Sequence, residues 1–146
     1  MASSSSDDIP APGQISIALL IVRIACGLPL LYHGSAILFG AFGGPGPHNF
    51  AAFIHAPDIV GYLVGIAQFC GALGILTGIL LRIGAVCIIV VMLGAIFLVH
   101  LPHGFDISKG GLEYALTLLL CALALLISGG GAYSLSSALP EGLRKL

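Results

Sequence analysis

Charged residues are scarce in this sequence. Only 8% of its 146 residues are Asp, Glu, Lys or Arg, whereas about 25% is usual in soluble globular domains. None of these residue types lies between Arg23 and Asp58, and Arg82 is the one charged residue between Asp58 and Asp106. Hydrophobic residues make up 58% of the chain. So long an uncharged, apolar sequence excludes an ordinary soluble fold and predicts an integral membrane protein.

A basic N-terminus is also missing. Residues 1–13 are polar and acidic and contain no Lys or Arg. A cleavable signal peptide begins with a basic segment, so we expect the first apolar segment to stay in the membrane, after a disordered cytoplasmic tail over residues 1–13. The net charge of -1 offers no basic surface to nucleic acid, and we expect no such partner.

Paired cysteines are the third absence. The chain has four Cys, one in each predicted span, and none forms a CxxC motif: Cys26, Cys70, Cys87 and Cys121. A buried Cys usually behaves as a small hydrophobic residue. We therefore favour a packing role over a disulfide or redox role, and the pattern argues against a thiol oxidoreductase of the vitamin K epoxide reductase kind.

What the chain does contain is enough apolar sequence for four membrane crossings. A helix needs about 20 apolar residues to cross a bilayer, and clusters of Gly and Pro separate such segments here. We predict an all-α membrane domain over residues 14–128, a four-helix transmembrane bundle with spans at about 14–39, 57–81, 83–101 and 110–128. Arg82 marks a tight turn, and residues 129–146 form a short cytoplasmic tail.

The positive charges predict an orientation. Lys and Arg concentrate in the cytoplasmic loops of membrane proteins. Arg82, Arg144 and Lys145 fall on one side of the predicted bundle, with the start of the first span, and Lys109 falls on the other. We expect both termini in the cytoplasm and a multi-pass protein of the cytoplasmic (inner) membrane, in contact with lipid.

Glycine recurs along one face of the second span. Gly71, Gly74 and Gly78 follow this face, and the last two have the GxxxG spacing. Small residues allow membrane helices to approach closely. We predict helix packing within the bundle along this stripe, in preference to a specific dimer motif.

The five histidines all fall toward the predicted outer side of the membrane. In an antiparallel bundle, His33, His100 and Glu113 can meet in one layer. Tyr32 and Tyr114, next to His33 and Glu113 in sequence, either supply hydroxyls to this layer or are interfacial aromatics. An ionisable residue within a span suggests function, because burying it is costly. The alternatives are a structural hydrogen bond for His33 and a first-turn carboxylate, favoured by the helix dipole, for Glu113.

Two further polar residues lie deep in the spans. Arg23 and Gln68 have similar predicted depths, and we expect a hydrogen bond between them that supports the bundle. The alternative is that the first span starts later and that Arg23 extends to the cytoplasmic surface.

A layer of His and Glu between apolar walls suits a quinone, whose two carbonyls need hydrogen-bond partners and a proton donor. Haem held by His33 and His100, or zinc held by His100, His103 and Asp106, is less well supported, and we expect no metal and no covalently bound cofactor. Transport is disfavoured because the chain has no inverted repeat.

Several segments, in this order and spacing, resemble the DoxX family over roughly residues 15–137. They are Arg23-Ile-Ala-Cys-Gly-Leu-Pro-Leu-Leu-Tyr-His-Gly34, Gly71-Ala-Leu-Gly-Ile-Leu-Thr-Gly-Ile-Leu-Leu-Arg82, Met92-Leu-Gly-Ala-Ile-Phe-Leu-Val-His100, Gly111-Leu-Glu-Tyr-Ala115 and Gly131-Ala-Tyr-Ser-Leu135. The resemblance implies a four-helix membrane subunit of a redox assembly, similar to a subunit of thiosulfate:quinone oxidoreductase. It also implies functional roles for Arg23, His33, His100 and Glu113.

The chain departs from the family pattern at three positions. Ile37 stands near a usual Lys, Gln68 replaces a common Glu, and Ser136 replaces a frequent Asp. Loss of a Lys and a Glu together suggests a lost internal ion pair. This favours a purely structural accessory subunit as the alternative to a quinone-proximal one, and leaves a stand-alone enzyme acting on a small sulfur compound as the weakest hypothesis.

Overall fold

The computed structural model describes residues 11–138 and 140–143, so the predicted tail lies outside it apart from residues 11–13. All regular structure in the described residues is helical. The α-helices are α1 (Pro12–Phe39), α2 (Gly46–Phe53), α3 (Asp58–Thr77), α4 (Leu81–Ala95) and α5 (Glu113–Ser128). The shorter elements are η2 (Ala41–Gly43), the π-helical η3 (Ile96–His100), η4 (Leu101–His103), η5 (Ile107–Lys109), η6 (Leu135–Ala138) and η7 (Glu141–Leu143).

Within these residues, three helical segments are long and apolar enough to cross a membrane. They are α1 with 28 residues, α3 with 20, and the continuous segment Leu81–His103 with 23. The fourth, α5, is apolar but has only 16 residues, or about 24 Å at 1.5 Å per residue, against a hydrocarbon core of ~30 Å. The helix of the predicted fourth span begins at Glu113 and not at Gly110, because the three residues before Glu113 belong to a hydrogen-bonded loop.

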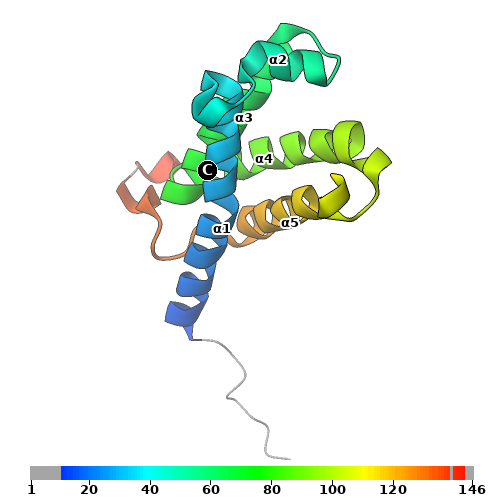
Figure 1. The fold of residues 1–146 in the computed structure, drawn as a ribbon. Coiled ribbons are helices and arrows are strands. Elements are labelled where there is room, and N and C mark those ends of the chain that lie inside the picture. Colours follow the sequence, from blue (N-terminus) through cyan, green and yellow to red (C-terminus); the bar gives the residue numbers. More distant parts are fainter. Residues whose placement is uncertain (1–10, 139, 144–146) are drawn as a thin grey trace, which may run out of the picture.

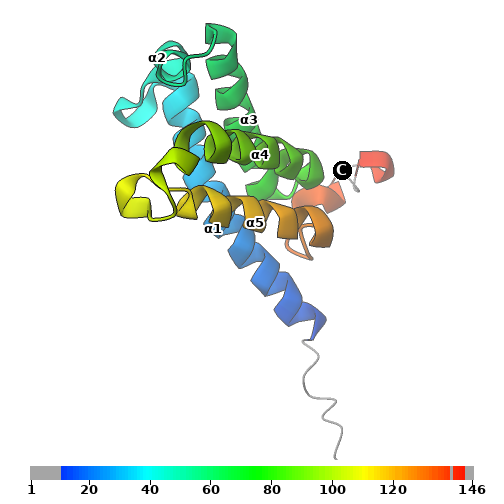
Figure 2. The same ribbon diagram turned by 90° about the vertical axis from the view of Figure 1, so that its right-hand side faces the viewer.

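The helices form two antiparallel pairs. Figures 1 and 2 show α1 beside α3, and α4 beside α5, with the second pair crossing α1 obliquely in both views. The N-terminal turns of α1 extend beyond the other helices, and α2 lies at the opposite end of the α1–α3 pair. The buried core between the pairs includes Leu30, Ile75, Ile88 and Leu125, one from each of the four long helices.

Close approach of α1 and α3 depends on glycine. A Cβ atom on Gly34 would lie 2.6 Å from the backbone nitrogen of Phe69, and one on Gly65 would lie 3.0 Å from the side chain of Leu38. Both distances are shorter than a normal carbon contact. The missing side chains therefore let the two backbones pack directly, as small residues do in membrane helices.

Glycine also mediates the crossing of α3 and α4. A Cβ on Gly84 would lie 2.8 Å from the carbonyl oxygen of Gly71, and one on Gly74 would lie 3.6 Å from the Cα of Gly84. Gly78 does not lie on the glycine stripe of α3, where it was predicted. It ends α3 with a φ of 77°, and its N–H donates to the Gly74 carbonyl, so it is a helix cap and not a residue of the α3–α4 packing face.

The turn between α3 and α4 lies earlier than Arg82. It consists of residues 78–80, and Leu80 adopts a φ of 51°, which is uncommon for a residue with a branched side chain. Arg82 lies exposed in the first turn of α4. The turn expected at Arg82 is therefore shifted to the glycine cap at Gly78 and the two residues after it.

Candidate functional site

Arg23 is almost completely buried, with 1% of its surface exposed. Its Nε donates to the carbonyl oxygen of Ile75 at 2.8 Å, and its Nη2 donates to that of Leu76. Its Nη1 donates to Gly130 at 3.1 Å and to Tyr133 at 3.0 Å. We call these contacts the Arg23 network, and all four acceptors are backbone carbonyls.

The end of α3 explains why a buried cation is tolerated here. Because α3 ends at Thr77, the carbonyls of Ile75 and Leu76 lack helical N–H partners four residues on. Carbonyls at a helix C-terminus also carry the negative end of the helix dipole. Among the described residues no carboxylate pairs with Arg23, so these oriented carbonyls compensate its charge.

The expected hydrogen bond between Arg23 and Gln68 is absent. Gln68 is buried, with 6% exposed, and its Oε1 has no partner among the described residues. The alternative, that Arg23 extends to the surface, is also wrong, because α1 begins at Pro12 and the guanidinium lies inside the fold. Carbonyls of α3 and of the C-terminal segment take the place of the expected side-chain partner.

The first residues of the predicted C-terminal tail, 129–134, are part of the fold. Gly130 and Tyr133 accept from Arg23, and the hydroxyl of Ser134 donates to the carbonyl of Gly78 at 3.0 Å. Positive φ values at Gly129 and Gly131, 78° and 69°, allow the chain to fold back over the end of α3. Sequence reasoning missed these contacts because backbone acceptors leave no residue-type pattern, and the run of three glycines was the one available signal.

Three of the predicted site residues gather on the exposed side of α1 and α5. The ring of His33 lies 5.5 Å from that of Tyr32 and 6.5 Å from that of Tyr114, and Tyr32 stacks on Phe42 at 4.8 Å. We call these four residues the aromatic patch. His33, Tyr32 and Tyr114 are all exposed, and no hydrogen bond joins their polar atoms to another described residue.

Packing around Gly34 fixes the direction of His33. Gly34 faces α3, and successive residues of a helix point about 100° apart, so His33 turns away from α3 and toward α5. Further toward the N-terminus of α1, the Cys26 thiol donates a weak hydrogen bond to the carbonyl of Leu118 at 3.8 Å. This contact joins α1 to α5 one helical turn after Tyr114.

His100 and Glu113 instead hold the loop that precedes α5. The Nδ1 of His100 lies 2.7 Å from the carbonyl oxygen of Gly110, and Oε2 of Glu113 accepts from the backbone N–H of Ile107 at 3.1 Å. The π-helical turn η3 ends at His100 and directs its ring toward this loop. The expected layer therefore divides into two groups, the aromatic patch with His33 and the loop contacts of His100 and Glu113.

The alternative zinc ligands are also separately engaged. Nδ1 of His103 lies 2.9 Å from the carbonyl of Val99, and Oδ1 of Asp106 accepts from the N–H of Ser108 at 2.9 Å. This bond lowers the pKa of the Asp106 carboxyl below its ordinary value. Within the part of the chain that the structure describes, no three His, Cys, Asp or Glu side chains are placed to hold a metal ion.

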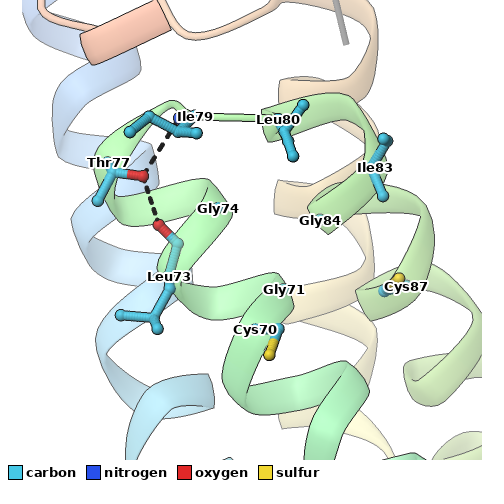
Figure 3. Close-up of a pocket in the computed structure, with 10 residues that line it drawn as sticks. All are labelled: Cys70, Gly71, Leu73, Gly74, Thr77, Ile79, Leu80, Ile83, Gly84 and Cys87. Atoms are coloured by element: carbon cyan, nitrogen blue, oxygen red, sulfur yellow. Dashed lines mark hydrogen bonds between the residues drawn. The ribbon is translucent and has the colours of Figure 1, made fainter. Parts of the chain in front are cut away.

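A shallow apolar groove of about 330 Å³ lies between α3 and α4 (Figure 3). Gly71, Gly74 and Gly84 form part of its wall, and Cys70 and Cys87 line it from opposite helices. The Thr77 hydroxyl on its rim already donates to the Leu73 carbonyl and accepts from the N–H of Ile79. The groove thus has apolar walls suited to lipid and lacks a free polar group there to orient a ligand.

These features define the class. Long apolar helices, glycine-mediated packing and a buried arginine compensated by backbone carbonyls describe a small multi-pass integral membrane protein. The chain belongs to the DoxX family, whose model matches residues 18–101, more than half of the sequence. The matched segment contains Arg23, His33, Gln68 and His100 and ends before Glu113. No curated protein and no solved structure matches the chain.

Proposed function

We propose that this DoxX-family protein is a membrane subunit of a quinone-linked redox complex and that its aromatic patch meets the quinone head group. One observation carries the proposal. His33, Tyr32 and Tyr114 are polar side chains on the exposed surface of apolar helices, without hydrogen bonds to other described residues. A polar side chain on the surface of an apolar membrane helix favours a polar partner, and a quinone head group can provide one.

The chemistry of the patch fits a quinone. A neutral imidazole has one N–H donor and one acceptor nitrogen, and a tyrosine hydroxyl can donate. His33 and Tyr114 can therefore donate to a carbonyl that gains electron density on reduction, and His33 can pass on a proton. The stacked rings of Tyr32 and Phe42 offer an aromatic surface to the flat head group.

Photoaffinity labelling with a short-chain azido-ubiquinone tests this assignment in native membranes. The proposal predicts an adduct on the peptide that contains Tyr32 and His33, reduced strongly in a His33→Ala variant and by excess unlabelled quinone. Leu63→Ala is the matched control, because Leu63 is also exposed on a span but lies on α3. Equal labelling of the wild type and the His33 variant would contradict the proposal.

The second candidate is a structural accessory subunit without a quinone contact. It is favoured by Gln68, whose amide stands in place of the family's usual Glu and makes no hydrogen bond through Oε1 among the described residues. In this case substitutions at the glycine crossings should impair assembly more than loss of His33 does. Complex assembly that survives Gly74→Leu but not His33→Ala would count against it.

A further inference from the structure

Most backbone N–H groups are hydrogen-bonded in the loop between the Leu81–His103 segment and α5. Every N–H from residue 107 to residue 113 donates to an acceptor in the loop or, for Ile107, to the Glu113 side chain of α5. Asp106 supplies several of these acceptors: its carboxylate accepts from Ser108 at 2.9 Å, and its carbonyl accepts from Lys109 and Gly111 at 3.1 and 2.9 Å. Pairing these donors lowers the cost of moving the segment from water toward a bilayer, because lipid offers no hydrogen-bond partners.

Apolar side chains cover the outside of the same loop. Phe105 is 62% exposed and Ile107 is 51% exposed, and Leu98, earlier in the chain on η3, is 72% exposed. Lys109 is the one cation among the residues from 83 to 143, and it is exposed. A flexible Lys next to apolar residues can reach a lipid phosphate while its stem stays in the apolar layer.

The lengths of the paired helices place the loop. The segment Leu81–His103 has 23 residues, or about 34 Å, whereas α5 has 16 residues, or about 24 Å. The two run side by side (Figure 2), and Gly130 lies against Leu81 at one end of the pair. Because the two segments are aligned at that end, the difference in their lengths lies at the other end, where the loop folds back beside η3 and η4.

We propose that residues 104–112 lie within the lipid interface and complete the fourth crossing. Phe105 and Ile107 contact the acyl chains near the head groups, and Lys109 pairs with lipid phosphate. The occupant of this surface is lipid and not a second protein, because the exposed apolar residues Phe105 and Ile107 follow directly on the segment Leu81–His103, which is long and apolar enough to cross a membrane. This inference depends on the membrane crossing alone and is independent of the quinone assignment.

The sequence offers a direct test because it contains no Trp. Phe105→Trp and Ile107→Trp each place one reporter in the loop, and Val90→Trp places one in α4, where the side chain is 63% exposed. Each full-length variant is reconstituted in phosphatidylcholine vesicles brominated either near the head groups or near the chain ends. We expect blue-shifted emission from all three, with loop reporters quenched more by shallow bromines and the Val90 reporter more by deep ones.

Two results would overturn the proposal. Red-shifted emission that aqueous iodide quenches in both loop variants would place the loop in water. Blue-shifted emission that neither brominated lipid quenches would place it against protein, as in contact with a second copy. The second loop position keeps the test decisive if Phe105→Trp fails to fold.

Discussion

Arg23 on α1 donates to the carbonyl oxygen of Tyr133, 110 residues further along the chain, at 3.0 Å. This hydrogen bond connects the first membrane helix to the segment that follows the last one. The same guanidinium also holds the carbonyls at the end of α3. One buried cation therefore connects α1, the end of α3 and the segment after α5, and hydropathy alone does not predict these contacts.

Replacing Arg23 should destabilise the whole fold. Arg23→Met removes the donors of four carbonyls, that of Ile75 buried and the others partly buried. A buried unsatisfied group costs about 1–3 kcal/mol, so we expect a loss of about 3 kcal/mol. Arg82→Gln is the control, since Arg82 is exposed and should change stability by less than about 0.5 kcal/mol. Denaturant unfolding in mild detergent measures both, and equal stability of the two variants would argue against the network.

A methyl group at Gly34 should separate α1 from α3. Its Cβ would overlap backbone atoms of Phe69, and such overpacking costs about 1–3 kcal/mol. Gly94→Ala is the matched helical control, because nothing lies within 4 Å of a Cβ built there, and removing a helical glycine gains roughly 0.5–1 kcal/mol. The unfolding midpoints of the two variants should therefore move in opposite directions. A shift in the same direction would contradict the direct packing of α1 on α3 at Gly34.

Much of this helical layout could be predicted from the sequence, because the length of a bilayer crossing and the Gly and Pro clusters locate the apolar segments. The start of α5 could not be predicted, because Gly110 and Leu112 have the residue types of a span but are hydrogen-bonded in the preceding loop. The partners of Arg23 could not be predicted either, because backbone carbonyls have no side-chain signature. Within the site, the sequence placed His33, His100 and Glu113 in one layer. The structure has His33 near Tyr114, whereas His100 and Glu113 contact the loop before α5.

Loss of the Glu113 carboxylate should open the loop before α5. Glu113→Ala removes the acceptor for the N–H of Ile107, and a hydrogen bond to a charged group is worth about 1.5–3 kcal/mol. Amide hydrogen exchange at Ile107 should therefore accelerate by about tenfold or more. Tyr114→Phe should leave this exchange unchanged, and an unaltered rate in Glu113→Ala would show that the carboxylate does not hold the loop.

We propose that this chain works as a subunit beside a redox partner. Mass spectrometry of the full-length protein, extracted gently from its native membrane, tests it most directly. We predict a redox enzyme or cytochrome in stoichiometric amount with the chain, and the reaction of that enzyme would identify the electron donor. Recovery of the chain alone, or only with copies of itself and lipid, would contradict the subunit account.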